Sequence, residues 1–192
     1  PMDGMIKVNG ITIAEDNEKY RKSISYIPEA PVLYDELTLE EHINLTAMAY
    51  GLNMKEAWEK ADVLLKLFKL SDKKKFFPVH FSKGMKQKVM IICSFLVEPN
   101  LYIIDEPFLG LDPIAINDLI NLMCEKRDNG ASILMSTHIL ATAEKYCDNF
   151  IIIHEGKILA SGKLSDLRKE FNMPDASLDE IYLALTTRGK DE

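Results

Sequence analysis

The chain has 192 residues, of which 47% are hydrophobic and 28% charged, a composition typical of a globular protein that can bury a full core. Its formal net charge of -7 argues against general nucleic-acid binding, which usually needs a basic surface. The three cysteines are widely spaced and form no Cys-x-x-Cys pair, which disfavours a disulfide scaffold or a zinc site. The mostly apolar stretch from Val89 to Val97, interrupted by Ser94, is far shorter than the roughly 18 residues of a membrane span. We therefore expect membrane association only through a partner.

The first part of the chain predicts short strands. Residues 5–8 and 11–14 flank Asn9-Gly10, which is a strong hairpin signal. Residues 23–27 alternate between apolar and polar and stop at Pro28, which predicts a further strand.

A helical block follows. Thr38 and Glu41 have capping-box spacing, and apolar residues then recur with a helical period through Leu52. Asn53 begins a second predicted helix, and residues 38–96 are predicted to be almost entirely helical.

Beyond this block, strands and helices alternate, which indicates a parallel sheet with right-handed crossovers. Asp112 is predicted to cap a helix that has Pro113 at its first position. The other predicted elements are strands at 101–104, 132–135, 150–154 and 158–160, and helices at 140–146, 164–171 and 178–185.

The predicted fold class is α/β, with a mostly parallel sheet, an inserted helical subdomain and C-terminal helices. We expect residues 1–30 and 97–163 to form the sheet core, residues 31–96 the helical subdomain, and residues 164–192 a C-terminal helical extension.

A candidate catalytic site follows the strand at 101–104, which runs directly into the carboxylates Asp105 and Glu106 and then Pro107. Ligands of open α/β sheets collect at the carboxyl ends of strands. An acidic pair at that edge suits phosphoryl transfer, in which one carboxylate holds Mg²⁺ and the other positions or deprotonates the attacking water. The same string is also a common way for a buried strand to end.

Five strings in this order resemble the ATP-binding subunits of ABC transporters, over essentially the whole chain. The strings are Ser25-Tyr26-Ile27-Pro28-Glu29 at the Q-loop position, Ser82-Lys83-Gly84-Met85-Lys86-Gln87 as the signature motif, Leu101–Pro107 as the Walker B strand, Gly110-Leu111-Asp112 as the D-loop, and Ser136-Thr137-His138 with the switch histidine. The sequence of residues 27–45 and 81–89 is most similar to the Ecs-type bacterial transporter ATPases.

The resemblance implies roles around ATP and Mg²⁺. Asp105 would hold the metal, Glu106 would activate the hydrolytic water, and His138 would contact the γ-phosphate. Glu29, at the Q-loop position, would also ligate Mg²⁺. A lone histidine after a strand is, however, often a satisfied structural residue.

Other residues would serve a second ATPase subunit. Ser82, Lys83 and Gly84 open a predicted helix whose N-terminus can bind an anion, and the family places this end against the nucleotide of the opposite subunit. An ordinary N-cap serine is the alternative. For Asp112, a helix cap and a dimer contact stay equally open.

The resemblance also implies an integral membrane permease as partner, with the ATPase on the cytoplasmic face of the membrane. The segment from Glu29 to Tyr34 would contact that permease, unless it is simply a linker that faces the core. No nucleic-acid partner is expected.

The chain departs from the family pattern in three places. It contains no Gly-x-x-x-x-Gly-Lys-[Ser/Thr] motif, because none of its Gly-Lys pairs precedes Ser or Thr. We therefore expect a fragment that begins after the P-loop and is inactive alone. Glu29 replaces the usual glutamine, and Lys83 and Met85 alter the signature, which predicts a slower or asymmetric site.

Two other classes compete with an ATPase that drives a permease. Soluble ABC proteins act on nucleic acids or ribosomes, but they usually carry coiled-coil insertions, tandem ATPase halves or basic arms. A non-catalytic interaction module is the third class.

Overall fold

The computed structural model describes residues 4–187, so Pro1–Asp3 and residues 188–192 of the predicted terminal domains lie outside the described residues. The chain divides into two compact units, residues 1–136 and residues 137–192. Within the described part of the chain, no helix has both the length and the apolar character needed to cross a membrane.

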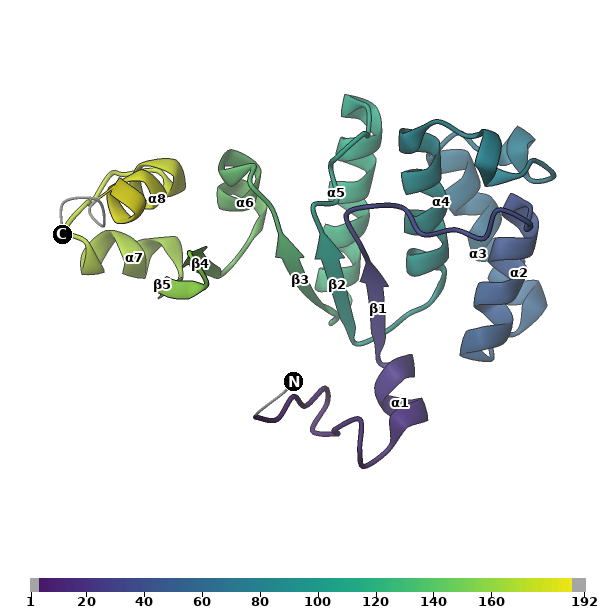
Figure 1. Cartoon of the computed structure of the whole chain (residues 1–192), viewed down its shortest axis with the longest axis horizontal. Coiled ribbons are helices and arrows are strands. Elements are labelled where there is room, and N and C mark those ends of the chain that lie inside the picture. Colours follow the sequence, from purple (N-terminus) through teal and green to yellow (C-terminus); the bar gives the residue numbers. More distant parts are fainter. Residues whose placement is uncertain (1–3, 188–192) are drawn as a thin grey trace. The chain divides into compact units, whose positions relative to one another are not determined.

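A three-stranded parallel sheet lies at the centre of the first unit, in the order β1-β2-β3 (Figure 1). The strands are β1 (Ile24–Ile27), β2 (Leu101–Asp105) and β3 (Ser132–Ser136). All three predicted strands are thus confirmed. Helical crossovers separate them in sequence, which lets consecutive strands run in the same direction.

Helices cover one face of this sheet. Helix α4 (Lys83–Leu96) packs beside β1, and helix α5 (Pro113–Asp128) lies beside β3 (Figure 1). The rings of Phe95 on α4 and Tyr102 on β2 stack with 4.7 Å between their centroids. The opposite face carries a row of Tyr26, Ile103 and Leu134, which are in register across the three strands.

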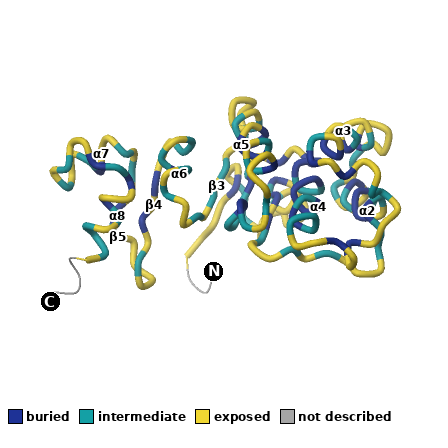
Figure 2. Tube along the Cα trace, turned by 90° about the horizontal axis from the view of Figure 1, so that it is seen from above, coloured by how far each residue is buried: buried dark blue, intermediate teal, exposed yellow. Residues whose placement is uncertain are grey.

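The predicted helical block contains α2 (Leu39–Tyr50), α3 (Met54–Leu67), the short 3₁₀ turns η1 (Ser71–Lys73) and η2 (Pro78–His80), and α4. The predicted capping box is present: Thr38 accepts from the Glu41 amide, and the Glu41 carboxylate accepts from the Thr38 amide at 2.7 Å. Seen from above, buried positions of these helices gather where the helices face each other (Figure 2).

The prediction of strands at 5–8 and 11–14 is wrong. Only one antiparallel bridge forms, between Val8 and Ile11, around a turn in which Asn9 and Gly10 have φ values of 50° and 77°. A two-stranded hairpin is marginal in water without a third strand, and among the described residues none pairs with this one. A short helix that the sequence analysis did not predict, α1 (Asn17–Lys22), follows it.

The second unit has its own apolar core. It contains α6 (Leu140–Tyr146), the antiparallel pair β4 (Phe150–His154) and β5 (Lys157–Gly162), α7 (Leu164–Glu170) and α8 (Leu178–Thr187), as predicted. Its buried side chains are Ala143, Phe150, Ile152, Ala160, Leu167, Ala176, Leu178 and Ile181. Glu144 joins two of its helices by accepting from the Leu178 amide at 2.7 Å.

Candidate functional site

Asp105 is the last residue of β2 and lies opposite Ser136, the last residue of β3. The Ser136 hydroxyl donates a hydrogen bond to the Asp105 carboxylate. Two neighbouring parallel strands therefore present a carboxylate and a hydroxyl together at the carboxyl edge of the sheet, where ligands of such sheets bind.

Glu106 turns the chain sharply out of the sheet. Its φ of 44° is in the left-handed region, which L-residues other than glycine adopt at a cost of about 1–3 kcal/mol. Its amide still donates to the Ser136 carbonyl at 3.1 Å, and Pro107 behind it is buried. The strained turn thus keeps Glu106 at the strand end rather than continuing the strand. Strain of this kind concentrates at functional sites.

The signature-like string lies against the loop that follows β2. Ser82 caps α4 by accepting from the Met85 amide at 3.3 Å, and Ser82 and Lys83 are exposed. A methyl group added to Gly84 would overlap with the carbonyl oxygen of Gly110. Only glycine allows this close approach between the start of α4 and the predicted D-loop.

Asp112 connects the same two segments through charge. It caps α5 by accepting from the Ala115 amide at 2.9 Å, and it pairs with Lys88 of α4 at 2.8 Å. The Lys88 ammonium, followed by the Ala115 amide, lowers the pKa of Asp112 to about 2. The predicted cap is confirmed, and Asp112 also has a partner on α4.

The two remaining predicted site residues lie in different parts of the chain. Residues 28–38 form the linker between β1 and α2. Glu29 is exposed on this linker two residues after β1, so it follows the strand next to β2 at the same sheet edge. His138 is exposed, two residues after β3, and belongs to the second unit. Its proximity to Glu106 stays a prediction.

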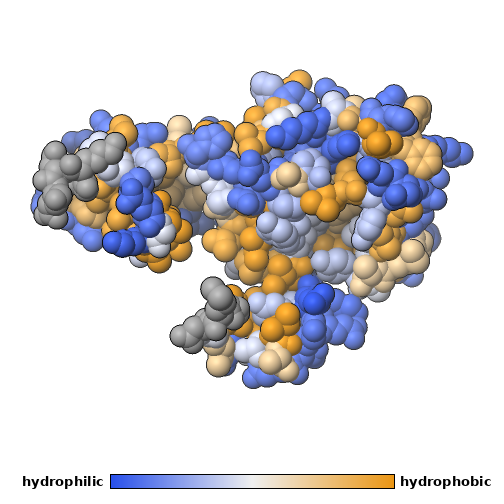
Figure 3. Space-filling model, in the orientation of Figure 1, coloured by the Kyte–Doolittle hydropathy of each residue, from blue (hydrophilic) through white to orange (hydrophobic). Residues whose placement is uncertain are grey.

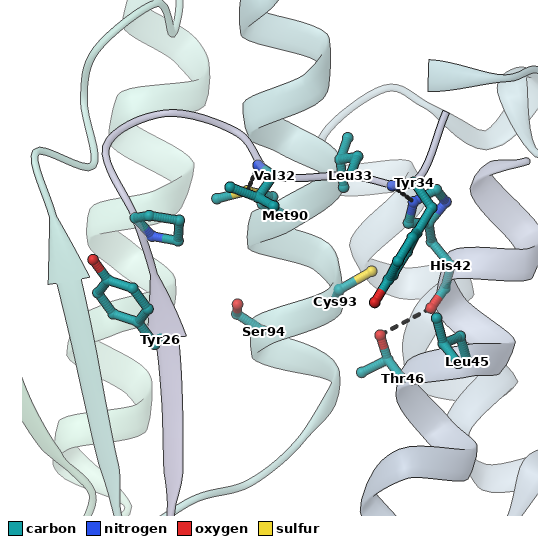
Figure 4. A pocket seen from close by; sticks show the side chains of 11 residues that line it. Tyr26, Val32, Leu33, Tyr34, His42, Leu45, Thr46, Met90, Cys93 and Ser94 are labelled. Carbon is teal, nitrogen blue, oxygen red and sulfur yellow. Dashed lines mark hydrogen bonds between the residues drawn. The ribbon is translucent and has the colours of Figure 1, made fainter. Parts of the chain in front are cut away.

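A groove of about 480 Å³ lies between β1, the linker, α2 and α4 (Figure 4). Its lining is mostly apolar: Tyr26, Pro28, Val32, Leu33, Tyr34, His42, Leu45, Thr46, Met90, Cys93 and Ser94. Apolar surface is visible where the linker crosses this part of the first unit (Figure 3). Burial raises the pKa of the Cys93 thiol to about 11, so this cysteine stays protonated at neutral pH.

The donor set at the sheet edge fits a hard divalent cation. Asp105 and Glu106 offer carboxylate oxygens, and Ser136 a hydroxyl oxygen. Mg²⁺ prefers oxygen ligands and is usually bound by one or two carboxylates together with waters and substrate phosphates. Among residues 4–187, no group of three or more His, Cys, Asp or Glu side chains converges as a metal site.

Some site contacts were not predicted. Ser136 was noted only as part of a string, and the pairing of Lys88 with Asp112 joins residues on different helices. The contact of Gly84 with Gly110 was missed as well, although a glycine near the start of each segment was a usable signal. Each of these contacts depends on tertiary packing.

Comparisons with known proteins agree on one family. Residues 1–109 match the family model described as "ABC transporter". The chain is 62% identical over 186 residues to the ABC-type transporter ATP-binding protein EcsA of Bacillus subtilis, covering 97% of this chain and 75% of that protein. It is 44% identical to the uncharacterized ABC transporter ATP-binding protein YthP of the same organism, covering 83% of this chain and 68% of that protein.

The fold agrees too. A solved structure described as the ATP-binding subunit of an ABC transporter superposes with a TM-score of 0.94 at 57% identity, covering 97% of this chain and 78% of that one. The predicted fold class and the resemblance to Ecs-type ATPases are therefore confirmed.

Proposed function

This chain belongs to the ATP-binding subunits of ABC transporters, which bind and hydrolyse ATP. From that premise we propose which of its residues bind Mg²⁺ and which act in hydrolysis. The observation that carries the proposal is the edge of the sheet where Asp105, Glu106 and Ser136 meet. There, Asp105 would hold Mg²⁺ and Glu106 would take the proton of the attacking water. A bound Mg²⁺ supplies charge neutralisation at the phosphates.

Glu29 and His138 complete the proposed hydrolytic site. Glu29 follows the strand next to β2 and offers a further oxygen ligand to the metal. His138 follows β3, the strand on the other side, and would donate to the γ-phosphate from its imidazole. Three adjacent strand ends would thus supply the groups that act on one phosphate.

The N-terminus of α4 is proposed to face the nucleotide of a second ATPase subunit, either an identical or a different one. Ser82, Lys83 and Gly84 are at the start of a 14-residue helix, whose dipole and free amides favour an anion. The close contact of Gly84 with Gly110 would place the loop containing Asp112 at the same subunit interface.

A permease is proposed to dock on the groove beside the linker, which would place this ATPase at the inner face of the membrane. Val32 and Tyr34 are 76% and 61% exposed beside the groove, and Met48 on α2 is 63% exposed. Exposed apolar side chains around a concave site are typical of a protein-binding surface.

The domain boundaries are also proposed. Residues 1–30 and 97–163 would form the sheet core, residues 31–96 the helical subdomain, and residues 164–192 a C-terminal extension.

Exchange of Glu106 for glutamine tests the catalytic proposal. The assay compares ATP binding and ATP hydrolysis by the unaltered protein and by the variant. Removing a general base typically lowers turnover by about 10²–10⁴-fold, so Glu106→Gln should bind ATP·Mg²⁺ normally and lose hydrolysis on that scale. The control is Glu59→Gln, an exposed carboxylate on α3. Normal hydrolysis by Glu106→Gln would refute the assigned role.

Exchange of the linker's apolar side chains tests the docking proposal. Leu33→Ser together with Tyr34→Ser should weaken binding to the permease by about tenfold or more, because buried apolar and aromatic anchors dominate such interfaces. Val63→Ser removes a 65% exposed side chain on α3 and should leave binding intact. Equal affinity of the linker variant and the unaltered protein would count against docking at this groove.

A further inference from the structure

The backbone of the linker is fastened to two helices by side chains. The Val32 amide donates to the Met90 sulfur on α4 at 3.0 Å, and the Tyr34 amide donates to Nε2 of His42 on α2 at 3.0 Å (Figure 4). A thioether is a weak acceptor, whereas a neutral imidazole nitrogen is a good one. His42 therefore provides the stronger of the two attachments.

The surroundings of His42 select one form of its ring. The residue is only 5% exposed, and its Nδ1 lies 2.8 Å from the carbonyl oxygen of Thr38. That oxygen can only accept, and the Tyr34 amide can only donate. A neutral imidazole protonated at Nδ1 satisfies both partners, whereas the other tautomer mismatches both, and the imidazolium places a donor against the Tyr34 amide.

This attachment restricts the position of Tyr34 on the linker. Thr38 is the N-cap of α2, so the imidazole joins the linker to the first turn of that helix. The Tyr34 ring lies beside the imidazole, with 6.1 Å between ring centroids, and reaches down the groove toward Cys93 and Thr46 (Figure 4). Fixing the Tyr34 amide therefore also restricts where its side chain can point.

We propose that His42, as the Nδ1-protonated tautomer, is a positioning residue that fixes linker residue Tyr34 in the arrangement that the permease binds. The part concerning the permease rests on the proposed function. The fastening of the linker does not depend on it.

Nuclear magnetic resonance of the whole chain tests the fastening directly. The nitrogen shifts of His42 should show protonation at Nδ1 at neutral pH. In His42→Leu, which lacks both hydrogen bonds, the Tyr34 amide should exchange with solvent about tenfold faster, as the net free energy of one hydrogen bond implies. His42→Gln offers an acceptor and a donor again and should restore much of the protection.

The buried Leu119 amide on α5 serves as the control, since local release of the linker leaves its exchange unchanged. Faster exchange at Leu119 would show that His42→Leu unfolds the domain. The test of the proposal would then rest on the tautomer of His42 in the unaltered protein and on Tyr34 exchange in His42→Gln. An Nε2-protonated or charged ring in the unaltered protein, or equal Tyr34 exchange in a folded His42→Leu, would overturn the proposal.

Binding to the permease in detergent or vesicles separates this inference from the proposed function. His42→Leu should bind about tenfold more weakly, and His42→Gln should recover most of that loss. Equal binding by His42→Leu and the unaltered protein would overturn the positioning role. Failure of the unaltered protein itself to bind at the groove would refute the docking proposal and leave the fastening of the linker in place.

Discussion

Asp112 shows how one carboxylate can couple a helix start to a second helix. It accepts from the Lys88 ammonium and from the Ala115 amide, and both donors favour its charged form. Its pKa is therefore lowered to about 2 from the usual value near 4. A lowered carboxyl pKa contributes stability above the unfolded-state value, and that contribution is lost as the pH falls toward the folded-state value.

We predict that Asp112→Asn removes part of the acid sensitivity between pH about 4 and 2. Asparagine can still cap α5, but it cannot ionise or pair with Lys88. The measurement is the free energy of unfolding in urea as a function of pH. Asp35→Asn, an exposed linker carboxylate, is the control. An unchanged pH slope in Asp112→Asn would contradict the prediction.

For single residues, the sequence predicted those structural roles that depend on neighbouring residues in the chain. Asp112 was predicted to cap a helix because Pro113 follows it. Asp105 and Glu106 were predicted to lie at a strand end because an apolar run precedes them. The left-handed conformation of Glu106 and the partnership with Ser136 were not predictable, since both depend on how β3 lies beside β2.

The helices and strands show the same distinction: elements defined by local contacts were predicted correctly, and an element that needs distant partners was not. The capping box at Thr38 and Glu41 located α2, because its hydrogen bonds join residues three positions apart. The predicted strands at 5–8 and 11–14 failed, because a strand needs partners that its own pattern does not supply. Helix α1 was missed although Asp16 caps it, since its six residues are too few to show an apolar period.

Gly84→Ala tests the packing of α4 on the loop after β2. By helix propensity alone, replacing glycine with alanine should stabilise the chain by about 0.5–1 kcal/mol. The overlap with the Gly110 carbonyl opposes this, and overpacking costs about 1–3 kcal/mol. We therefore predict net destabilisation, measured by denaturant unfolding, while the exposed control Lys83→Ala should be nearly neutral. A more stable Gly84→Ala would mean that this contact is loose.

On the scale of the whole molecule, the two units have separate cores. Among the described residues, the buried side chains of the second core run from Ala143 to Ile181, whereas the buried residues of the helical block and β1–β3 belong to the first unit. The family and fold class were predictable because five strings occur in a fixed order. The proximity of His138 to Glu106 stays a prediction, since these residues belong to different units.

Native-state hydrogen exchange should reveal this division. Residues 137–187 are expected to exchange through an opening that leaves the amides of residues 4–136 protected, because units with separate cores unfold separately. The measurement is the opening free energy of each slowly exchanging amide at increasing denaturant. A single free energy shared by amides of β2 and β4 would contradict two separate units.

Gly84 at the start of α4 contacts Gly110, and one turn further along the helix Lys88 forms an ion pair with Asp112. Two contacts about 6 Å apart along the helix axis restrict the rotation of α4 against the loop that contains Gly110 and Asp112. In the proposed function, a nucleotide that displaced Ser82 would therefore also move the chain that leaves Glu106. The proposed catalytic carboxylate would respond to that nucleotide through two contacts between α4 and the loop after β2.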